Sequence, residues 1–600
     1  MKLMQYEKQG EKNYLQALII IDSLVMGGVK NVVISPGSRS TTLVLACERH
    51  PNIKTWIHID ERSACFFALG LATDTKIPTA IIATSGSAIC NWLPAISEAN
   101  LSHIPLLLLS ADRPIELQKV GANQTLEQQN LLSSQVREFF QLPENAQQSI
   151  ELQQRITHAL SLSQWPNAGP VHVNIPIREP LLPDANNAQL LEQKLIALEK
   201  QIIGQQQPIH LHPAQTSIAE ELLSQFASEI TGQSGLIICG RDSYSRQLIK
   251  LIEALAKQLN CPIFADPLSN IRLNHSSENV IYNYDSFLVS PIVSKLPSPD
   301  WILRIGQLPI SKNLSGYLQL IPESKMYLIT PYNDYPDPLY LTDSIFHSTP
   351  EIFITKLLTK KIRPAKTDFL PVVQHLERQC TQIIQDSCLL DNPSACQEGI
   401  LFKELIEQIK DGGLLFSANS MTIRDIDTFI HKKNSPNNSA LKIFANRGCS
   451  GIDGNVSSFF GLLASSDKTR TCLAVLGDLT SIHDSNGFLW AKELQAQGYS
   501  ATIIILNNHG GAIFNYLPQK QLSCFEKAWV TDVDLDFAQL AKLYQLHYQR
   551  VESASNFANS LTTAIQHSGI SLIEVLIDQK QSLEQHTMLK NNISNTLKLS

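Results

Sequence analysis

Close cysteine pairs are absent from this sequence. Its 11 cysteines are scattered without a CxxC arrangement, and the evenly spaced Cys380, Cys388 and Cys396 lack close pairs or histidine partners. This spacing excludes the usual zinc sites and is typical of reduced, structural thiols. We therefore predict a protein without a cysteine-based metal centre, in a reducing compartment.

Long hydrophobic runs and an excess of basic residues are also missing. No run approaches the roughly 18 apolar residues of a membrane span. Residues 1–24 mix acids and bases, as the start of an amphipathic helix does and a signal peptide does not. The formal net charge of −7 argues against nucleic acid as the main partner, because nucleic-acid binding needs a broad basic surface. We expect a soluble cytoplasmic protein in which local arginines meet any anionic substrate.

The chain is too long for one core, and its pattern divides it into three regions. Short apolar runs alternate with helical patterns in each region, which predicts parallel, doubly wound α/β domains. The first and third regions are similar in size but show no residue-level repeat. The predicted parts are a first domain at 1–185, a linker at 186–215 with a helix at 187–201, a central domain at 216–362, a third domain at 369–580 and a loose polar tail at 581–600.

Buried strands are predicted wherever an apolar run of four to seven residues ends in turn residues. In the first region these runs are 31–35, 55–59, 79–84, 105–110 and 171–175. In the central region they are 235–239, 262–265, 301–305 and 326–329. In the third region they are 414–417, 442–445, 472–476, 501–506 and 572–577.

The most informative segment is 473–514, which contains two apolar strands joined by an amphipathic helix. The first strand ends in Gly477-Asp478 and the second in Asn507-Asn508. In an open parallel sheet ligands bind at this carboxyl edge. Carboxylate and amide oxygens suit Mg²⁺ or Ca²⁺, and Mg²⁺ usually arrives with phosphate. The segment therefore predicts a metal-diphosphate site.

Three turn-rich loops follow strands of the first region, at 36–40, 85–87 and 111–114. A Gly/Ser loop at a helix N-terminus offers free backbone N–H groups to an anion. The alternative is that Ser, Gly and Pro only cap helices and turn the chain. Arg39 and Arg113 are not needed for turning, so we consider both as substrate ligands.

Glu61 follows a predicted strand directly and begins a predicted helix, 61–73. One interpretation is an acid in the first helical turn, stabilised by the helix dipole. The other is a carboxylate at a strand end that exchanges a proton in the cleft, with a pKa set by its surroundings.

Further polar residues follow strands of the third region or lie beyond the third loop. Arginine is well suited to these positions because its planar fork binds both oxygens of a carboxylate. A single arginine is usually a surface group, but here four follow apolar strands. These candidates are Asn123 and Gln124 in the segment 121–124, Ser420 and Arg424 after the strand 414–417, and Arg447 in the loop 446–454.

Taken in order, the motifs SPGSRS, HIDERSACFFALGLA, TSGSA, LSADRPIEL, GANQ, ANSMTIRDID, NRGCSGIDG and GDL…NNHGG resemble one family. It is the 2-succinyl-5-enolpyruvyl-6-hydroxy-3-cyclohexene-1-carboxylate (SEPHCHC) synthase family of thiamin-diphosphate enzymes in menaquinone biosynthesis. The resemblance covers the first and third regions and is weak in the central region and tail. It implies three doubly wound parallel-sheet domains. They are a pyrimidine-binding domain, a central domain and a diphosphate-binding domain, in this order along the chain.

The resemblance also implies a cofactor site for thiamin diphosphate with Mg²⁺ or Mn²⁺. Asp478, Asn508 and the backbone carbonyl of Gly510 would hold the metal. Glu61 would hydrogen-bond the pyrimidine N1′, and Ile452 would hold the cofactor bent. The other cofactor-binding residues implied are Ser420, Gly451, Gly477, Leu479 and Ile513.

The implied reaction decarboxylates 2-oxoglutarate and adds the resulting carbanion to isochorismate in a 1,4-addition. Both substrates are dicarboxylates. The resemblance implies a homodimer, or a dimer of dimers, with active sites at the subunit interface. The implied substrate-binding residues are Ser38, Arg39, Arg113, Asn123, Gln124, Lys312, Ser420, Arg424, Arg447 and Phe514.

Three positions depart from the family pattern. Leu479 replaces a glycine, Asn313 replaces the arginine often found after Lys312, and His509 replaces an asparagine. Two other functions stay open at this point. One is a thiamin-diphosphate decarboxylase or carboligase with a different acceptor, and the other is a catalytically inactive homologue.

Overall fold

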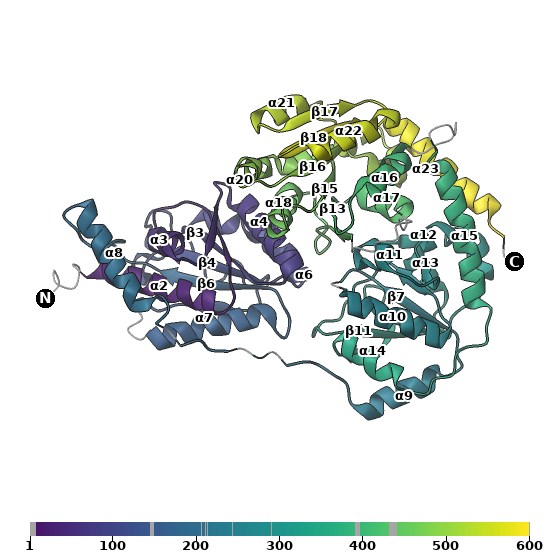
Figure 1. Ribbon diagram of the computed structural model, residues 1–600, viewed down its shortest axis with the longest axis horizontal. Helices are drawn as coiled ribbons and strands as arrows, with labels where there is room; N and C mark the ends of the chain where they lie inside the picture. Colours follow the sequence, from purple (N-terminus) through teal and green to yellow (C-terminus); the bar gives the residue numbers. More distant parts are fainter. Residues whose placement is uncertain are drawn as a thin grey trace. The chain divides into compact units, whose positions relative to one another are not determined.

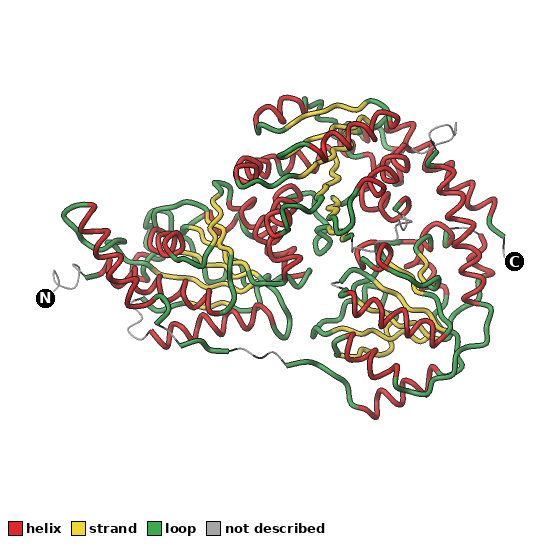
Figure 2. Tube along the Cα trace, in the orientation of Figure 1, coloured by secondary structure: helices red, strands yellow, loops and turns green. Residues whose placement is uncertain are grey.

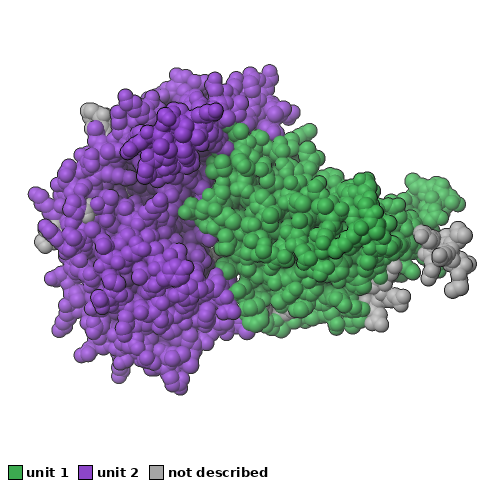
Figure 3. All heavy atoms as spheres, turned by 180° about the vertical axis from the view of Figure 1, so that it is seen from behind, with its two compact units in different colours: residues 1–213, 446–468, 480–499 green, residues 214–445, 469–479, 500–600 purple. Residues whose placement is uncertain are grey.

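The computed structural model describes residues 8–144, 149–205, 207–210, 212, 214–242, 244–289, 291–389, 397–430 and 441–598. These residues form three six-stranded sheets (Figures 1 and 2) in which every described strand pair is parallel. The predicted architecture of three parallel-sheet α/β domains is confirmed. The chain divides into two compact units, and Figure 3 colours them separately: one comprises 1–213, 446–468 and 480–499, and the other 214–445, 469–479 and 500–600.

The first sheet has the strand order β2-β1-β3-β4-β6-β5. Its central strands are buried along their whole length, as expected when helices cover both faces of a parallel sheet. The strands are β1 (Asn31–Ile34), β2 (Lys54–Ile57), β3 (Thr79–Ala83), β4 (Leu106–Asp112), β5 (Phe139–Gln141) and β6 (Pro170–Pro176). The helices are α2 (Gln9–Met26), α3 (Thr41–Arg49), α4 (Glu61–Thr75), α5 (Ser87–Cys90), α6 (Leu93–Leu101), η1 (Ile115–Leu117), α7 (Ser149–Gln164) and α8 (Ala188–Ile202).

Helix α8 lies inside the segment 186–215 that was expected to be a linker. Its N-cap is Asn187, whose side chain accepts a hydrogen bond from the Leu190 N–H, so the predicted helix start is correct within one residue. Leu195 and Leu198 belong to the core of the first sheet. This part of the segment therefore packs as a helix of the first domain.

The central sheet has the order β12-β11-β10-β7-β8-β9, which is the doubly wound order with its switch point between β7 and β10. The strands are β7 (Gly235–Cys239), β8 (Ile263–Ala265), β9 (Val280–Ile281), β10 (Trp301–Ile305), β11 (Lys325–Thr330) and β12 (Thr342–His347). The helices are α9 (Glu220–Ile230), α10 (Arg246–Leu259), η2 (Pro267–Ser269), α11 (Ile271–Asn274), α12 (Tyr284–Phe287), η3 (Pro291–Lys295), α13 (Lys312–Leu320) and α14 (Pro350–Leu358).

The third sheet has the order β14-β13-β15-β16-β18-β17. The strands are β13 (Leu414–Ser417), β14 (Lys442–Phe444), β15 (Cys472–Gly477), β16 (Ala501–Asn507), β17 (His547–Val551) and β18 (Ile570–Leu576). The helices are α15 (Phe369–Ser387), α16 (Gln397–Gln408), α17 (Met421–Phe429), α18 (Asn455–Ser465), α19 (Asp478–His483), η4 (Ser485–Leu489), α20 (Trp490–Ala496), η5 (Ala512–Tyr516), η6 (Pro518–Gln521), the π-helical η7 (Glu526–Val530), α21 (Phe537–Leu543), α22 (Ala554–Gln566) and α23 (Gln579–Thr596).

The C-terminal segment is a helix, so the expectation of a loose tail at 581–600 is wrong. Helix α23 is capped by Asp578, which accepts a hydrogen bond from the Gln581 N–H at 2.8 Å. Leu589 and Ile593 are buried in a hydrophobic core. The segment contains few apolar residues among many polar ones. Such a narrow apolar stripe is weak evidence for a helix when only the sequence is considered.

Helices α4 and α18 pack together in the first unit at glycine contacts. A Cβ on Gly70 would come within 2.1 Å of the Ser458 carbonyl oxygen, and one on Gly461 within 2.1 Å of the Phe67 carbonyl oxygen. Both positions need glycine because the two backbones approach so closely. The contact matters for the site because α4 begins at Glu61 and α18 follows the loop 446–454.

The described cysteines, ten in number, are free thiols. Cys396 of the evenly spaced set lies outside the described residues. Among the helices that the structure describes, none combines the length and apolar content needed to cross a membrane.

Candidate active site

Two adjacent strands of the third sheet bring Asp478 and Asn508 to its carboxyl edge. Strand β15 ends just before Asp478 and pairs in parallel with β16, which ends just before Asn508. The buried Asp478 carboxylate accepts hydrogen bonds from the Leu479 N–H at 2.6 Å and from the Gly510 N–H at 2.8 Å. Asp478 therefore connects the loops after both strands.

The donor set at this edge fits a hard cation. The side-chain oxygen of Asn508 is buried and has no hydrogen-bond partner, which is costly for a polar atom. Burial raises the pKa of Asp478, although the N–H groups of Gly510 and Leu479 favour its charged form. Oxygen ligands are those that Mg²⁺ prefers. No group of three or more His, Cys, Asp or Glu side chains suited to a metal occurs in the described ranges. One carboxylate, one amide oxygen and a backbone carbonyl remain the candidate set.

Glycine is required at 510. Its φ is +126°, and a Cβ there would come within 2.1 Å of the Val530 carbonyl oxygen. His509, the departure from the family pattern, has φ +58° and lies 3.7 Å from Asp532 as an exposed ion pair. The side chain at this position is therefore exposed and close to Asp532, and it also acts electrostatically on Asp478.

Gln579 contacts the same loop, although no motif in the sequence indicated this residue. The Gln579 amide N–H donates to the Asn508 carbonyl oxygen at 2.5 Å, and its oxygen accepts from the Asn515 amide at 3.0 Å. Asn515 lies in η5, which carries the half-buried Ile513 and Phe514. The first residue of α23 thus contacts both parts of the predicted cofactor and substrate surface.

Ser420 has a strained backbone at the end of β13. Its φ of +71° and ψ of −131° are values that glycine, but rarely serine, adopts. Arg424, one turn along α17, donates to the Ser420 carbonyl oxygen. Burial lowers the pKa of the Arg424 guanidinium, because few water molecules reach it. Strain and a desolvated cation on one short segment are features of a binding site.

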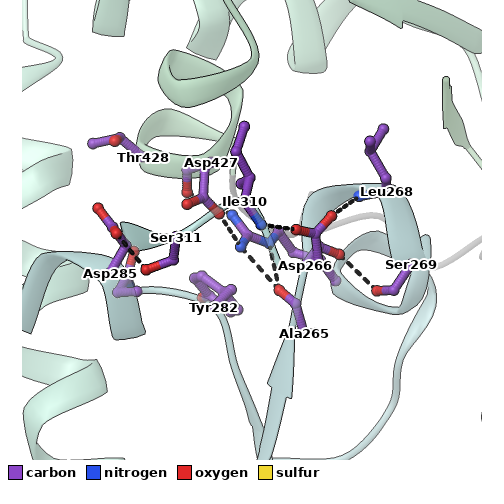
Figure 4. A network of polar contacts seen from close by, with 12 residues as sticks. Ala265, Asp266, Leu268, Ser269, Tyr282, Asp285, Ile310, Ser311, Asp427 and Thr428 are labelled. Atoms are coloured by element: carbon purple, nitrogen blue, oxygen red, sulfur yellow. Dashed lines mark hydrogen bonds and ion pairs between the residues drawn. The ribbon is translucent and has the colours of Figure 1, made fainter. Parts of the chain in front are cut away.

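A buried ion pair and a buried aspartate–histidine contact hold α17 in place. Asp427 pairs with the fully buried Arg272 at 2.6 Å, and Asp425 pairs with His586 of α23 at 3.0 Å. Arg272 also donates to the Ala265 carbonyl oxygen at 2.9 Å. Figure 4 shows this network, in which Asp427 and Ala265 are labelled. Helix α17 is therefore held by the central domain on one side and the C-terminal helix on the other.

Lys312 begins α13 and is exposed. The Asn313 amide donates to the Asp285 carbonyl oxygen at 3.0 Å, and Ser311, the N-cap of α13, donates to the Asp285 carboxylate. Figure 4 labels Ser311 and Asp285 of this contact. Asn313, which replaces the expected arginine, thus makes a structural contact and supplies no positive charge. Lys312 remains as a cation at the start of α13.

Glu61 stands next to the residue that caps its helix. Asp60, rather than Glu61, accepts hydrogen bonds from the Arg62 and Ser63 N–H groups at 2.9 and 3.3 Å. The Glu61 carboxylate accepts from the Asn91 amide at 3.1 Å. Capping of α4 is therefore achieved by Asp60, and Glu61 is an acid in the first turn of the helix, so both interpretations of this residue stay open.

Arg113 and Gln124 meet at the loop after β3. Arg113 donates to the Ser85 hydroxyl at 2.7 Å, and the Gln124 amide donates to the Ser85 carbonyl oxygen at 2.9 Å. The Gly86 N–H, at φ +88°, donates to the buried Gln128 side chain at 3.1 Å. Gln128, which was not among the residues predicted from the sequence, thus binds the backbone of this loop through its side chain.

The remaining first-region candidates differ in exposure. Arg39 is buried and donates to the Ile177 carbonyl oxygen and the Glu179 carboxylate, at 2.9 and 2.8 Å. Its Nε is buried without a hydrogen-bond partner. Ser38 and Asn123 are exposed, and no described contact of their side chains explains their positions.

A buried carboxylate holds the loop that carries Arg447, Gly451 and Ile452. Glu98 of α6 accepts hydrogen bonds from the Gly448 and Cys449 N–H groups, both at 2.7 Å. The apolar side chain of Ile452 is 37% exposed. Sequence reasoning missed Glu98 because it lies 350 residues from Gly448.

The predicted site residues are divided between the two units. The first unit contains Ser38, Arg39, Glu61, Arg113, Asn123, Gln124, Arg447, Gly451 and Ile452. The second contains Lys312, Ser420, Arg424, Gly477, Asp478, Leu479, Asn508, Gly510, Ile513 and Phe514.

Comparison with known families gives two matches within the chain. Residues 17–134 match the family described as "Thiamine pyrophosphate enzyme, N-terminal TPP binding domain". Residues 435–575 match "Thiamine pyrophosphate enzyme, C-terminal TPP binding domain". The two matches include the segments that contain Glu61, Asp478 and Asn508.

Similar curated proteins extend over nearly the whole chain. A SEPHCHC synthase of Oceanobacillus iheyensis is 37% identical over 94% of this chain and 95% of its own length. That of Chloroflexus aurantiacus is 38% identical over 96% of both chains. The Listeria welshimeri synthase is 34% identical over 99% of this chain and all of its own.

Solved structures show a similar fold at low sequence identity. Benzoylformate decarboxylase from Polynucleobacter necessarius superposes with a TM-score of 0.70 at 16% identity, covering 94% of this chain and 98% of its own. A putative thiamin diphosphate-dependent enzyme from Mycobacterium smegmatis gives 0.68 at 15% identity, with 93% and 98% covered. These likenesses concern the fold alone.

Proposed function

This chain belongs to the SEPHCHC synthase family, and we propose that it catalyses the reaction for which the family is named. It is a thiamin-diphosphate-dependent enzyme of menaquinone biosynthesis. In the proposed reaction 2-oxoglutarate loses CO₂, and its remaining succinyl unit adds to isochorismate in a 1,4-addition. The full-length likeness to the named synthases is the observation that carries this proposal.

We propose that Asp478, Asn508 and the Gly510 carbonyl oxygen hold Mg²⁺ or Mn²⁺ with the cofactor's diphosphate. The unpartnered oxygen of Asn508 beside the buried Asp478 supports this assignment. Gly477, Leu479 and Ser420 would form the rest of the diphosphate surface. When bound, thiamin diphosphate supplies the electron sink for decarboxylation.

Glu61 is the proposed proton-transfer residue. Its carboxylate would hydrogen-bond the pyrimidine N1′ of the cofactor and exchange a proton there. The position of Glu61 at the first residue of α4, just beyond the carboxyl end of β2, supports this role. Gly451, Ile452 and Ile513 would line the cofactor, with the exposed Ile452 as its apolar support.

The proposed substrates are dicarboxylates, whereas the chain has a formal net charge of −7. Attraction must therefore come from local cations, and Arg39, Arg113, Arg424 and Arg447 are the candidates. Ser38, Asn123, Gln124, Lys312, Ser420 and Phe514 would complete the substrate surface. Burial lowers the pKa of Arg113, with Arg39 nearby as a second cause, while the carboxylates of Glu179 and Asp112 oppose the shift.

We also propose a cytoplasmic homodimer, or dimer of dimers, with sites at the subunit interface. The free cysteines support a reducing compartment. The family resemblance supports the assembly, and sedimentation of the purified protein tests it. A monomer that retains full activity would contradict it.

The decisive experiment measures CO₂ release from 2-oxoglutarate with thiamin diphosphate and Mg²⁺, with and without isochorismate. Release that depends on isochorismate, with SEPHCHC formed, is the expected result. Release that needs no isochorismate would instead indicate a decarboxylase or a carboligase with another acceptor. Cofactor binding without any release would indicate a different oxoacid or an inactive homologue.

A further inference from the structure

The C-terminal helix reaches the proposed metal site through its first residue, Gln579. The Gln579 amide donates to the Asn508 carbonyl oxygen at 2.5 Å and accepts from the Asn515 amide at 3.0 Å. The glutamine amide presents a donor on its nitrogen and an acceptor on its oxygen, and both atoms are used here. The residue is therefore matched to both of its neighbours.

These two contacts fix the loop that contains a proposed metal ligand. The Asn508 carbonyl belongs to the peptide unit that leads into His509, whose φ is +58°, and then Gly510, whose φ is +126°. The Gly510 N–H is held by Asp478 at 2.8 Å. Gln579 thus anchors one end of this unusual backbone and Asp478 the other, so the direction of the Asn508 side chain depends on both.

The second contact reaches the apolar part of the site. Asn515 follows Ile513 and Phe514 in the short helix η5. A bond from Asn515 to Gln579 therefore ties the position of this helix to that of the metal loop. The Gln579 side chain therefore connects the metal loop to the helix that carries Ile513 and Phe514. The proposed reaction needs both in fixed positions relative to each other.

Gln579 belongs to a helix, α23, that is held in place by contacts of other residues. Helix α23 is capped by Asp578 through the Gln581 N–H at 2.8 Å, so the helix start does not depend on the Gln579 side chain. His586 pairs with the buried Asp425 at 3.0 Å, and Ile593 is buried in the core. The helix is thereby attached to the domain over several turns.

We infer that Gln579 is a positioning residue that orients Asn508 for the metal and diphosphate and aligns the Ile513–Phe514 turn with them. The inference rests on the proposed function, because it assumes the metal site at Asp478 and Asn508. Residues that hold metal ligands from outside typically contribute about 10- to 100-fold to metal affinity. Gln579 should contribute within this range.

The test is the Mg²⁺ dependence of thiamin diphosphate binding, measured by titration calorimetry on the full-length protein without substrate. For Gln579→Ala we expect the Mg²⁺ concentration at half-saturation to rise about tenfold or more. The melting temperature of the cofactor-free variant should stay at the wild-type value, because the cap of α23 is untouched. Asn515→Leu, which leaves the bond to Asn508 in place, should have a smaller effect on Mg²⁺.

Gln408 provides a matched control. Its amide donates to the Ala558 carbonyl oxygen at 2.9 Å and accepts from the Thr562 hydroxyl at 3.0 Å, with no predicted site residue involved. Gln408→Ala should leave Mg²⁺ dependence unchanged. An equal loss in both variants would overturn the inference, because it would reflect general loosening of the domain.

The outcomes separate this inference from the proposed function. If the wild-type protein binds thiamin diphosphate with Mg²⁺ and Gln579→Ala binds it equally well, the positioning role is wrong and the proposed function stands. If the wild-type protein shows no Mg²⁺-dependent binding, the proposed metal site itself is wrong and the inference falls with it.

Discussion

The first and third sheets share one strand order but carry different chemistry at corresponding strand ends. In each sheet the order is second, first, third, fourth, sixth and fifth strand. The second strands are followed by Glu61 in one sheet and Arg447 in the other, and the fourth strands by Arg113 and Asn508. The topology determines which edge can bind a ligand, and the loop residues decide what is bound.

The central sheet is the counterexample within the same chain. Its strands follow the order third, second, first, fourth, fifth and sixth. Of the predicted site residues it carries only Lys312, at the start of α13. The doubly wound topology alone therefore does not account for the candidate residues, nearly all of which lie in polar loops of the other two sheets.

The largest expected effect concerns the acid of the first sheet. Glu61→Gln should lower kcat by roughly 100- to 10,000-fold, the range for removing a positioned proton-transfer group. Thiamin diphosphate binding should be nearly unchanged, because this sheet is not the proposed metal site. Steady-state kinetics and calorimetry measure the two quantities. Asp60→Asn, which keeps a good N-cap, should retain activity. Near-normal turnover in Glu61→Gln would remove this residue from the mechanism.

The second effect concerns the acid of the third sheet. Asp478→Ala should weaken Mg²⁺-dependent cofactor binding by more than roughly 100-fold, because it removes a charged metal ligand. Residues that only hold such ligands in place contribute up to about 100-fold. Asp112→Asn alters a buried carboxylate at the end of β4 in the first sheet and should leave Mg²⁺ dependence intact. If both variants lose Mg²⁺ dependence equally, the division of roles between the two sheets is wrong.

The third effect compares buried carboxylates of the two units. Asp427→Asn leaves the fully buried Arg272 without its charged partner, and should lower the free energy of unfolding by about 3 kcal/mol. Urea denaturation measures the change. Asp484→Asn in the first unit replaces a buried carboxylate that accepts hydrogen bonds from the N–H and hydroxyl of the neutral Ser457, and should not destabilise the protein at pH 8. Equal losses in both variants would contradict this difference.

The same Asp484 predicts a pH dependence of stability. Burial raises the pKa of this carboxyl group to about 7, well above that of an ordinary aspartate. Between about pH 4 and pH 7 the folded protein therefore keeps a proton that the unfolded chain releases, and stability falls as the pH rises through this window. Denaturation from pH 4.5 to 8 should show a shallower fall for Asp484→Asn. Parallel wild-type and variant curves would show that the carboxyl group is not protonated in the folded state.

The smallest effect concerns backbone strain at strand ends. Gly86 after β3 and Ser420 after β13 have similar φ and ψ, +88° and −145° against +71° and −131°. Ser420→Gly should raise the free energy of unfolding by about 1 kcal/mol while kcat/KM falls, because the strain serves the site. Gly86→Ala should lower it by a similar amount. Calorimetric melting measures the stability of both variants. A less stable Ser420→Gly variant would show that the contacts of the serine side chain stabilise the protein by more than its backbone strain destabilises it.

The sequence predicted the buried strands well and the edge strands poorly. The missed strands β5, β9, β12 and β17 all lie at a sheet edge. Three of them are only partly buried, and β9 has two residues. Edge strands need no continuous apolar run, so neither periodicity nor length distinguishes them from loops.

The positions of the candidate site residues were predictable where those residues belong to a local sequence motif. Asp478 and Asn508 end apolar strands, and Glu61 follows one, so their positions at a sheet edge follow from the strand pattern. Their partners were not predictable. Glu98 meets Gly448 across 350 residues, and Gln579 lies in a segment that resembles a polar tail.

The sequence by itself determined the α/β class, the three sheets and the residues that end their strands, because burial of apolar runs and turn chemistry are local properties. Only the tertiary structure decided which strands are neighbours, which backbone positions are strained and which distant side chains hold the loops in place. Gln579 and Arg272 are examples. A single polar residue in a helix has the same local pattern whether it faces solvent or supports a site, and only long-range packing distinguishes the two.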